Sequence, residues 1–476
     1  MDEDDDTGSI LNRVMNELHV VKYHRENKST HDVVISKESF HPGDEIYCSY
    51  PYAAVSVPRR SSQICSYCFK RTKLMRCSRC RNTKYCSREC QARDWQHHKV
   101  VCCLNNTDAL THLLLRIVLS LVGSETMTPL YCDGRNDIYR KQFELETFLD
   151  LQEVLNRDPN IAAVELYKKC PFQNTLQQLI SEIAPRILEH SDTVLRERGF
   201  SDESLRRLQN GSPYSSKVTD YCLVRLLRKQ CVNIVPIRNH ILEIIGYGIY
   251  PTLSPIQHSC DPNCVVVFDE LCAKLIAIRP ICPNDLLTVS FISTRHAYPV
   301  RDDFLALYGC YVCDCPRCTW KSEEWKKKEK EAFAIKCPEV FNGISCSGLC
   351  FPIVSFPGTY PFEYSCSICH KSFNSLESME EYSFFHGFEG LQSHRDQDPN
   401  EININQLKRY ITQLDKLYPS RNPELLIARI LLLRYYANSE NYQAAVELGE
   451  FLLPLAVDVF GKSLELMAFV SIVVFF

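Results

Sequence analysis

Eight soft metal ligands, seven cysteines and one histidine, crowd one short stretch of this chain. They are spaced as two Cys-x2-Cys pairs, then a Cys-x3-Cys and a His-x3-Cys pair. Four sulfur or nitrogen donors per ion form the closed tetrahedral arrangement of structural zinc, so the spacing predicts two zinc sites rather than buried free thiols. So short a segment holds no large apolar core, and the metals must supply its folding energy. The predicted ligands are Cys65, Cys68, Cys77, Cys80, Cys86, Cys90, His98 and Cys102.

The length and composition of the whole chain indicate several domains. At 476 residues, 45% of them hydrophobic, it can bury more than one core. Its N-terminus is acidic and lacks a secretory signal, so the 26 cysteines indicate metal ligands and core thiols of a reducing compartment, the nucleus and cytoplasm. Its apolar runs fall short of the roughly 18 residues of a membrane span. We therefore expect a soluble monomer without a membrane partner.

The ligand-rich segment is also strongly basic. Twelve lysines and arginines lie between Arg59 and Lys99, against Glu89 and Asp94 alone. Such a field attracts nucleic acid or an acidic partner. An equally simple interpretation is that the cations solvate a small domain and offset its thiolate charge.

Hydrophobic periodicity divides the rest of the chain into strand-rich and helical parts. Residues 20–57 and 232–291 alternate β-branched and turn residues and predict short strands, with a turn at His41-Pro42-Gly43-Asp44. Residues 107–228 carry apolar positions at helical spacing. Three more amphipathic segments, at about 403–417, 423–437 and 441–456, resemble a short array of tetratricopeptide type.

A second group of cysteines accompanies a short polar motif. Gln257-His258-Ser259-Cys260 is followed by Cys313, Cys315 and Cys318, an arrangement that resembles the core of a SET domain and its post-SET zinc loop. The eight-ligand segment, with Tyr85-Cys86-Ser87 and Asp94-Trp95, resembles a MYND zinc finger. A SET domain split by a MYND finger is similar to the SET- and MYND-domain (SMYD) family of protein-lysine methyltransferases, over about residues 20–318.

The resemblance implies how the ligands divide among ions. One MYND ion would be held by Cys65, Cys68, Cys86 and Cys90, and the other by Cys77, Cys80, His98 and Cys102. A third zinc would be held by Cys260, Cys313, Cys315 and Cys318. The remaining group, Cys337, Cys346, Cys366 and Cys369, has the spacing of a zinc ribbon, against the alternatives of unligated thiols or of Cys350 as a substitute ligand. Three zinc ions are expected, and four if the ribbon is filled.

These observations predict a multi-domain α+β protein in which a split SET β-fold carries an inserted finger and a helical insert. The predicted parts are an N-terminal SET segment (18–58), a MYND-type zinc finger (60–105), a helical SET insert (106–230), a SET core (231–295), a post-SET zinc loop (296–320), a zinc ribbon (335–372) and a helical repeat-like C-terminal domain (380–476).

The resemblance also implies a chemistry. SET enzymes transfer a methyl group from S-adenosylmethionine to a lysine amine, and the protein contributes mainly by positioning donor and acceptor. The cofactor-contacting positions of the family match Asn233, Ser254, Ile256, Gln257 and His258. The second active-site tyrosine of the family matches Tyr308, and Phe291 stands where the first one belongs.

Four departures weaken the expectation of catalysis. His31 and Val33 occupy the places of two family glycines, where backbone should approach the cofactor. Gln257 replaces the motif asparagine, and Phe291 lacks a hydroxyl that would orient the amine. One extra residue separates Tyr308 from Cys313, so that Tyr311 competes for its role.

Three interpretations of the function therefore stay open. The first is a zinc-containing protein-lysine methyltransferase that uses S-adenosylmethionine, with histones as the substrate class that the resemblance implies. The second is a catalytically weak scaffold whose finger binds a proline-rich peptide or DNA in transcriptional regulation. A third interpretation, a nucleic-acid binder, rests on the basic patch alone.

Overall fold

The computed structural model describes nine stretches of the chain. They are residues 20–25, 32–57, 63–102, 233–239, 244–292, 313–319, 334–352, 363–374 and 404–460, with a few single positions between them. Most of the predicted helical insert at 106–230 lies outside the described residues. At its start, Leu113, Leu114 and Ile117 are helical and fully buried, as their spacing predicts.

Four strands precede the finger. β1 (Val21–Arg25) and β2 (Asp32–Ser36) form an antiparallel hairpin, and β3 (Glu45–Ser49) and β4 (Ala53–Ser56) follow. The predicted turn lies between β2 and β3, where Gly43 has a φ of +102° that a side chain rarely tolerates. The His41 amide donates to the Asp44 carboxylate at 2.7 Å and closes this turn.

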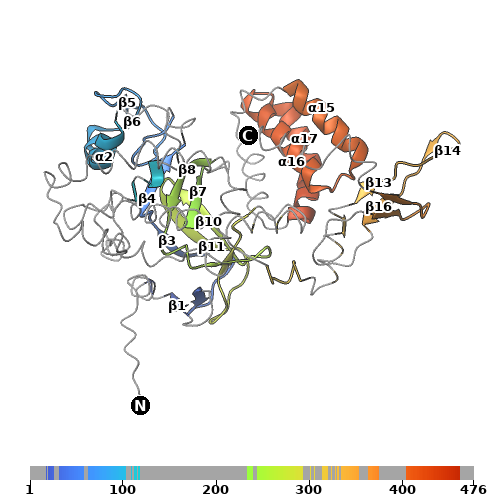
Figure 1. The fold of residues 1–476 in the computed structure, drawn as a ribbon, viewed down its shortest axis with the longest axis horizontal. Helices are drawn as coiled ribbons and strands as arrows, with labels where there is room; N and C mark the ends of the chain where they lie inside the picture. The colour runs from blue at the N-terminus through green and yellow to red at the C-terminus, as the bar shows by residue number, and fades with distance from the viewer. Residues whose placement is uncertain are drawn as a thin grey trace, which may run out of the picture.

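The strands before the finger pair with strands that lie far beyond it. β3 pairs with β11 (Cys272–Ala277), which in turn pairs with β10 (Cys264–Asp269), and Ser49 lies opposite Ala273. β4 pairs with β8 (Ile244–Ile249), which also pairs with β7 (Ile234–Arg238), and Ala53 lies opposite Ile249. The finger is therefore an insertion into one β-domain, as the sequence predicts (Figure 1).

The finger comprises a two-stranded sheet and one helix. β5 (Met75–Arg76) pairs with β6 (Lys84–Tyr85), and α2 (Arg88–Val101) follows. Its contact with the β-domain depends on a glycine in β8. A Cβ on Gly246 would lie 2.3 Å from the Phe69 ring and 2.5 Å from the Val55 carbonyl oxygen. Only glycine lets the buried Phe69 of the finger pack against this strand.

A second core joins the ribbon to the C-terminal helices. The ribbon sheet contains β13 (Ile335–Lys336), β16 (Leu349–Pro352), β17 (Glu363–Cys366) and β18 (Ser372–Asn374), and the hairpin β14 (Val340–Phe341) and β15 (Ile344–Ser345) projects from it. The helices are α15 (Ile404–Leu417), α16 (Pro423–Asn438) and α17 (Tyr442–Phe460). Ile335 and Tyr364 of the ribbon are buried together with Leu407 of α15 and Leu425 of α16.

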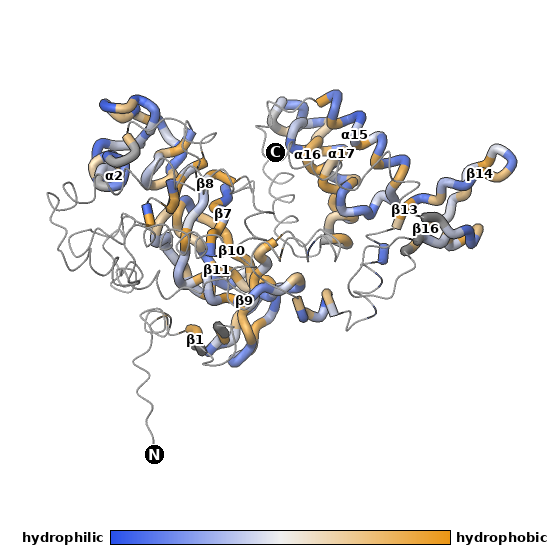
Figure 2. The backbone as a smooth tube through the Cα atoms, viewed as in Figure 1, coloured by the Kyte–Doolittle hydropathy of each residue, from blue (hydrophilic) through white to orange (hydrophobic). Residues whose placement is uncertain are grey.

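The three C-terminal helices confirm the helical segments predicted from periodicity. α16 begins after Asn422, whose side chain accepts hydrogen bonds from the Glu424 and Leu425 amides. Figure 2 shows many apolar residues along β7, β8 and β10, whereas hydrophilic and hydrophobic residues alternate along α15. Among the described residues, none of the helices combines the length and the apolar character that a membrane crossing requires.

Candidate metal centres and active-site strand

The first MYND group forms where a turn meets the start of α2. The donor atoms of Cys65, Cys68, Cys86 and Cys90 all lie within 4.8 Å of one another. The Sγ atoms are 3.5 Å apart between Cys68 and Cys86, and 3.4 Å between Cys86 and Cys90. Ser87 caps α2 by accepting a hydrogen bond from the Cys90 amide at 3.1 Å, which fixes Cys90 in the first helical turn.

The second MYND group joins a neighbouring turn to the end of α2. Cys77, Cys80, His98 and Cys102 converge within the same limit. The Cys77 and Cys102 Sγ atoms are 3.9 Å apart, and His98 Nε2 is 3.4 Å from Cys80 Sγ. His98 Nδ1 lies 3.5 Å from Thr83 Oγ1, so the ring presents Nε2 to the cysteines.

A third group ties the Gln257–Cys260 motif to the segment after the SET core. Cys260, Cys313, Cys315 and Cys318 are all buried and lie within 4.8 Å of one another. Arg301, which is fully buried, donates from Nη2 to Cys318 Sγ at 3.4 Å. This cation offsets part of the negative charge that four thiolates would bring into the interior.

The fourth group confirms that the ribbon cysteines converge. Cys337 and Cys369 have Sγ atoms 3.7 Å apart, and Cys346 and Cys366 have Sγ atoms 3.8 Å apart. Cys350 is buried beside them but is not one of the four converging donors. Glycine is required at position 348, because the Cβ of any other residue there would lie 2.4 Å from Cys366 Sγ.

Three of the Cys-x2-Cys turns share one backbone geometry. In each, the residue after the second cysteine has a positive φ: 64° at Phe69, 59° at Arg81 and 57° at His370. Each of these residues donates its amide to the carbonyl of the first cysteine, at 3.0, 3.0 and 3.2 Å. The ribbon turn therefore has the same construction as both turns of the finger, which supports a metal in the fourth group.

The donor spacings fit zinc. Four sulfurs at about 2.3 Å from a tetrahedral zinc ion lie about 3.8 Å apart. The separations of 3.4–3.9 Å in both MYND groups and in the ribbon bracket this value.

The crowded thiols within each group shift one another's pKa values. A hydrogen bond with Cys68 lowers the pKa of Cys65 to about 5, and the same contact raises the pKa of Cys68. In the third group, hydrogen bonds with Cys313, Cys315 and Cys318 raise the pKa of Cys260. Crowded thiols cannot all ionise by themselves, whereas a divalent ion stabilises every thiolate. Burial lowers the pKa of His98 and keeps it neutral, which is the form that binds metal.

The expected cofactor residues lie on and around one short strand. β9 (Gln257–His258) pairs in parallel with β12 (Thr288–Val289), and Phe291 follows β12. The rings of His258 and Phe291 lie 5.3 Å apart. The Phe291 amide donates to His258 Nδ1 at 3.0 Å, and His258 Nε2 lies 3.2 Å from Cys260 Sγ. The structure thus brings the predicted motif, the substituted tyrosine position and the third cysteine group together.

The other expected cofactor residues occupy neighbouring segments. Asn233 is buried immediately before β7. Ile256 is 1% exposed, and Ser254 is half-buried, with its hydroxyl donating to the Tyr250 carbonyl at 3.0 Å. Tyr308, Tyr311 and His31 lie outside the described residues, and of Val33 only the strand backbone is described. Their roles stay predictions.

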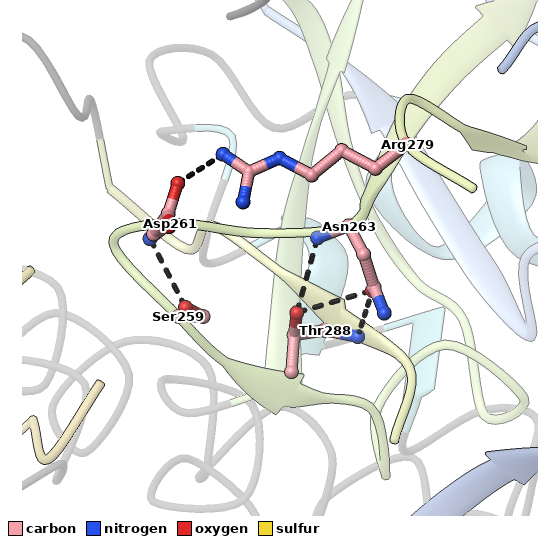
Figure 3. A network of polar contacts seen from close by, with 5 residues as sticks. All are labelled: Ser259, Asp261, Asn263, Arg279 and Thr288. Atoms are coloured by element: carbon pink, nitrogen blue, oxygen red, sulfur yellow. Dashed lines mark hydrogen bonds and ion pairs between the residues drawn. The ribbon is translucent and has the colours of Figure 1, made fainter. Parts of the chain in front are cut away.

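A polar network fixes the loop that carries Cys260 (Figure 3). The Asn263 amide donates to Thr288 Oγ1 at 3.2 Å, and the Thr288 amide donates to Asn263 Oδ1 at 2.9 Å. Asp261 pairs with Arg279, and its amide donates to Ser259 Oγ at 3.0 Å. This network holds the loop against β12. Sequence reasoning assigned no role to Thr288, Arg279 or Arg301, because their partners are distant in the chain.

Residues 65–102 match the family model of the MYND finger, which confirms the predicted finger. The chain is 28% identical over 290 residues to histone-lysine N-methyltransferase SMYD3 of Homo sapiens, covering 60% of this chain and 58% of that protein. It is 27% identical over 293 residues to histone-lysine N-methyltransferase ASHR1 of Arabidopsis thaliana, covering 60% and 52%. The chain thus spans somewhat more than half the length of these relatives.

A crystal structure of the SET domain of LSMT bound to MeLysine and AdoHcy aligns over 98% of this chain and 91% of that one. Its TM-score of 0.34 and sequence identity of 10% are too low to support any conclusion here.

Proposed function

We propose that this member of the SET- and MYND-domain (SMYD) family is an S-adenosylmethionine-dependent protein-lysine N-methyltransferase. Histones are the first substrate class to test, because SMYD3 and ASHR1 are both named histone-lysine N-methyltransferases. The observation that carries the proposal is that His258 contacts both Cys260 and the Phe291 amide, where β9 pairs with β12. The family resemblance locates the cofactor and the lysine amine at this strand.

Each residue has a physical task in this proposal. The bound cofactor would supply the methyl group from its positively charged sulfonium sulfur. Asn233, Ser254, Ile256, Gln257 and His258 would hold it by backbone and side-chain contacts, and Tyr308 would orient the lysine amine. Phe291 would contribute an apolar wall that excludes water but no hydrogen bond to the amine. We therefore expect slow turnover, because a missing general acid–base or orienting group lowers rates by about 10²- to 10⁴-fold.

The zinc ions have a structural role in the proposal. Sixteen residues would hold four ions, in the sets Cys65, Cys68, Cys86 and Cys90; Cys77, Cys80, His98 and Cys102; Cys260, Cys313, Cys315 and Cys318; and Cys337, Cys346, Cys366 and Cys369. In each of the four sites, protein side chains would fill all four coordination positions of the ion, which is typical of structural zinc. Thiolate sites of this kind persist in reducing compartments, and we propose the nucleus and cytoplasm as the sites of action.

The decisive experiment separates binding from turnover. Purified, zinc-loaded protein is titrated with S-adenosylmethionine by calorimetry and then incubated with histone octamers, whose lysines are mapped by mass spectrometry. We expect binding and slow methylation, with loss of binding in Asn233→Ala and faster methylation in Phe291→Tyr. Gln413→Ala, at an exposed position of helix α15, is the control. Absence of cofactor binding in correctly folded protein would contradict the proposal.

A scaffold function is the second candidate, and two observations favour it. Phe291 carries no hydroxyl, and a hollow on the finger is lined by Arg71, Arg76 and Lys84, together with Gln63, Thr72 and Leu74. A proline-rich peptide or DNA is the expected occupant. Binding of such a ligand, combined with no methyl transfer even in Phe291→Tyr, would favour the scaffold over the enzyme. DNA affinity that does not fall steeply with salt would exclude a simple electrostatic DNA site.

A further inference from the structure

His258 contacts two parts of the molecule through its two ring nitrogens. The Phe291 amide donates to Nδ1 at 3.0 Å, so Nδ1 carries no proton. In the neutral ring the proton is then on Nε2, which lies 3.2 Å from Cys260 Sγ. The geometry therefore fixes the tautomer, with Nε2–H donating to the sulfur and Nδ1 accepting from the backbone.

The two contacts belong to different structures. Cys260 is one of the four converging donors of the third cysteine group, whereas Phe291 lies two residues after the end of β12. The His258 ring also packs against the Phe291 ring, at 5.3 Å and an interplanar angle of 46°. Its own backbone is fixed by the pairing of β9 with β12, and the next amide, that of Ser259, donates to the Val289 carbonyl at 2.9 Å.

We propose that His258 is a positioning residue that couples zinc occupancy of the third cysteine group to the placement of Phe291. A filled site turns Cys260 into a thiolate with a fixed position, which is a stronger and better aligned acceptor for Nε2–H than a free thiol. The ring is then held at both nitrogens, and the Phe291 amide is held with it. Loss of the ion releases Cys260, the imidazole and the Phe291 backbone in turn.

The two His258 hydrogen bonds, to Cys260 and to the Phe291 amide, are called the His258 bridge below. Two conservative variants each remove one of them. In His258→Asn, Oδ1 takes the place of Nδ1 and can still accept from the Phe291 amide, but no donor reaches Cys260. In His258→Gln, the longer amide can reach Cys260 as a donor, but the acceptor for Phe291 is lost. A residue that only fills space would respond alike to both changes.

The first readout is hydrogen exchange of single backbone amides. In His258→Gln the Phe291 amide should exchange about 3- to 10-fold faster, the usual effect of one lost hydrogen bond, and in His258→Asn it should stay protected. The Ser259 amide is the internal control and should be unchanged in both. The second readout is zinc release to a chromogenic chelator, which should accelerate at one site in His258→Asn and not in His258→Gln.

Coupling itself is tested by removing the ion. Cys318→Ser, or partial chelation of the intact protein, should speed exchange at Phe291 in the wild type but add nothing in His258→Asn, where the bridge is already cut. Equal behaviour of the two His258 variants, or Phe291 exchange that ignores zinc loss, would overturn the proposal. Faster exchange of Ser259 to the same extent would also overturn it, by showing that His258 only holds β9.

The consequence for methyl transfer rests on the proposed function, since it assumes that Phe291 borders the lysine amine. The exchange and zinc-release measurements need neither cofactor nor substrate. A chain that shows the coupling but no cofactor binding would refute the methyltransferase and leave the bridge intact.

Discussion

The Asp94 carboxylate of α2 offers a sharp test of how the finger is held. Asp94 is fully buried, accepts a hydrogen bond from the Tyr85 hydroxyl at 2.6 Å, and lies 2.8 Å from the Arg116 guanidinium, which is 13% exposed. Breaking a buried pair by removing one partner destabilises by about 3–5 kcal/mol, because a charge is left uncompensated. Asp94→Ala should reduce the opening free energy of the finger by this amount.

The assay is native-state hydrogen exchange at the amides of α2 in zinc-saturated protein. Three to five kcal/mol corresponds to roughly a 150- to 5,000-fold increase in exchange through opening. Asp94→Asn, which keeps an acceptor for Tyr85, should lose less, about 1.5–3 kcal/mol. Adding Arg116→Met to Asp94→Ala should recover part of the loss, since the unmatched cation is removed with its partner.

The matched control is the ion pair of Glu89 with Arg93 on the same helix. It is as short, at 2.6 Å, but its side chains are 70% and 49% exposed. Glu89→Ala should therefore change the opening free energy by no more than about 0.5 kcal/mol. If Asp94→Ala were no more destabilising than Glu89→Ala, the argument from burial would be wrong.

Four further outcomes are expected. Gly246→Ala should destabilise the contact between finger and β8 by about 1–3 kcal/mol through overpacking, seen as a lower melting temperature; an unchanged temperature would contradict the 2.5 Å approach to the Val55 carbonyl. Arg81→Gly should stabilise the second MYND site by about 0.5–1 kcal/mol, because glycine adopts a φ of 59° without strain, and chelator-driven zinc release should slow. Burial holds the pKa of Tyr47 well above its ordinary value, so the folded protein keeps this proton when the unfolded chain loses it; stability should fall as pH rises above about 10, and urea titrations of Tyr47→Phe should show a weaker alkaline loss. Metal analysis should find four zinc ions per chain, one for each converging group, and fewer than three would break the assignment.

Local spacing accounts for what could be predicted from the sequence. A tetrahedral ion needs donors a few residues apart on tight turns. The spacing of Cys-x2-Cys pairs, such as Cys65 with Cys68 and Cys366 with Cys369, therefore predicted the ligand turns. The C-terminal helices were likewise predicted from their apolar residues. The buried Leu407, Ile411 and Leu414 of α15 follow the helical period, whereas α16 is apolar on most of its surface and lies buried between its neighbours. The family resemblance then located the strand of His258 within a split β-domain.

Non-local contacts could not be predicted in this way. Nothing near Gly246 indicates that Phe69 must pack on it, and nothing near Asp94 names Arg116 or Tyr85 as its partners. Asn263 and Thr288 are separated by 25 positions, yet their paired hydrogen bonds hold the Cys260 loop. These residues become partners only when folding brings distant segments together in the interior, where each buried polar group needs a hydrogen-bond partner.

The sequence by itself thus determined the metal-ligand groups, the finger and the C-terminal helices, because ligand spacing and helical period are properties of neighbouring residues. Only the tertiary structure decided that β3 and β4 pair with β11 and β8 across the finger, and that His258 lies between Cys260 and the Phe291 backbone. The physical reason is that strand pairing and a two-sided imidazole need partners brought from distant parts of the chain, and the folded core alone sets those distances.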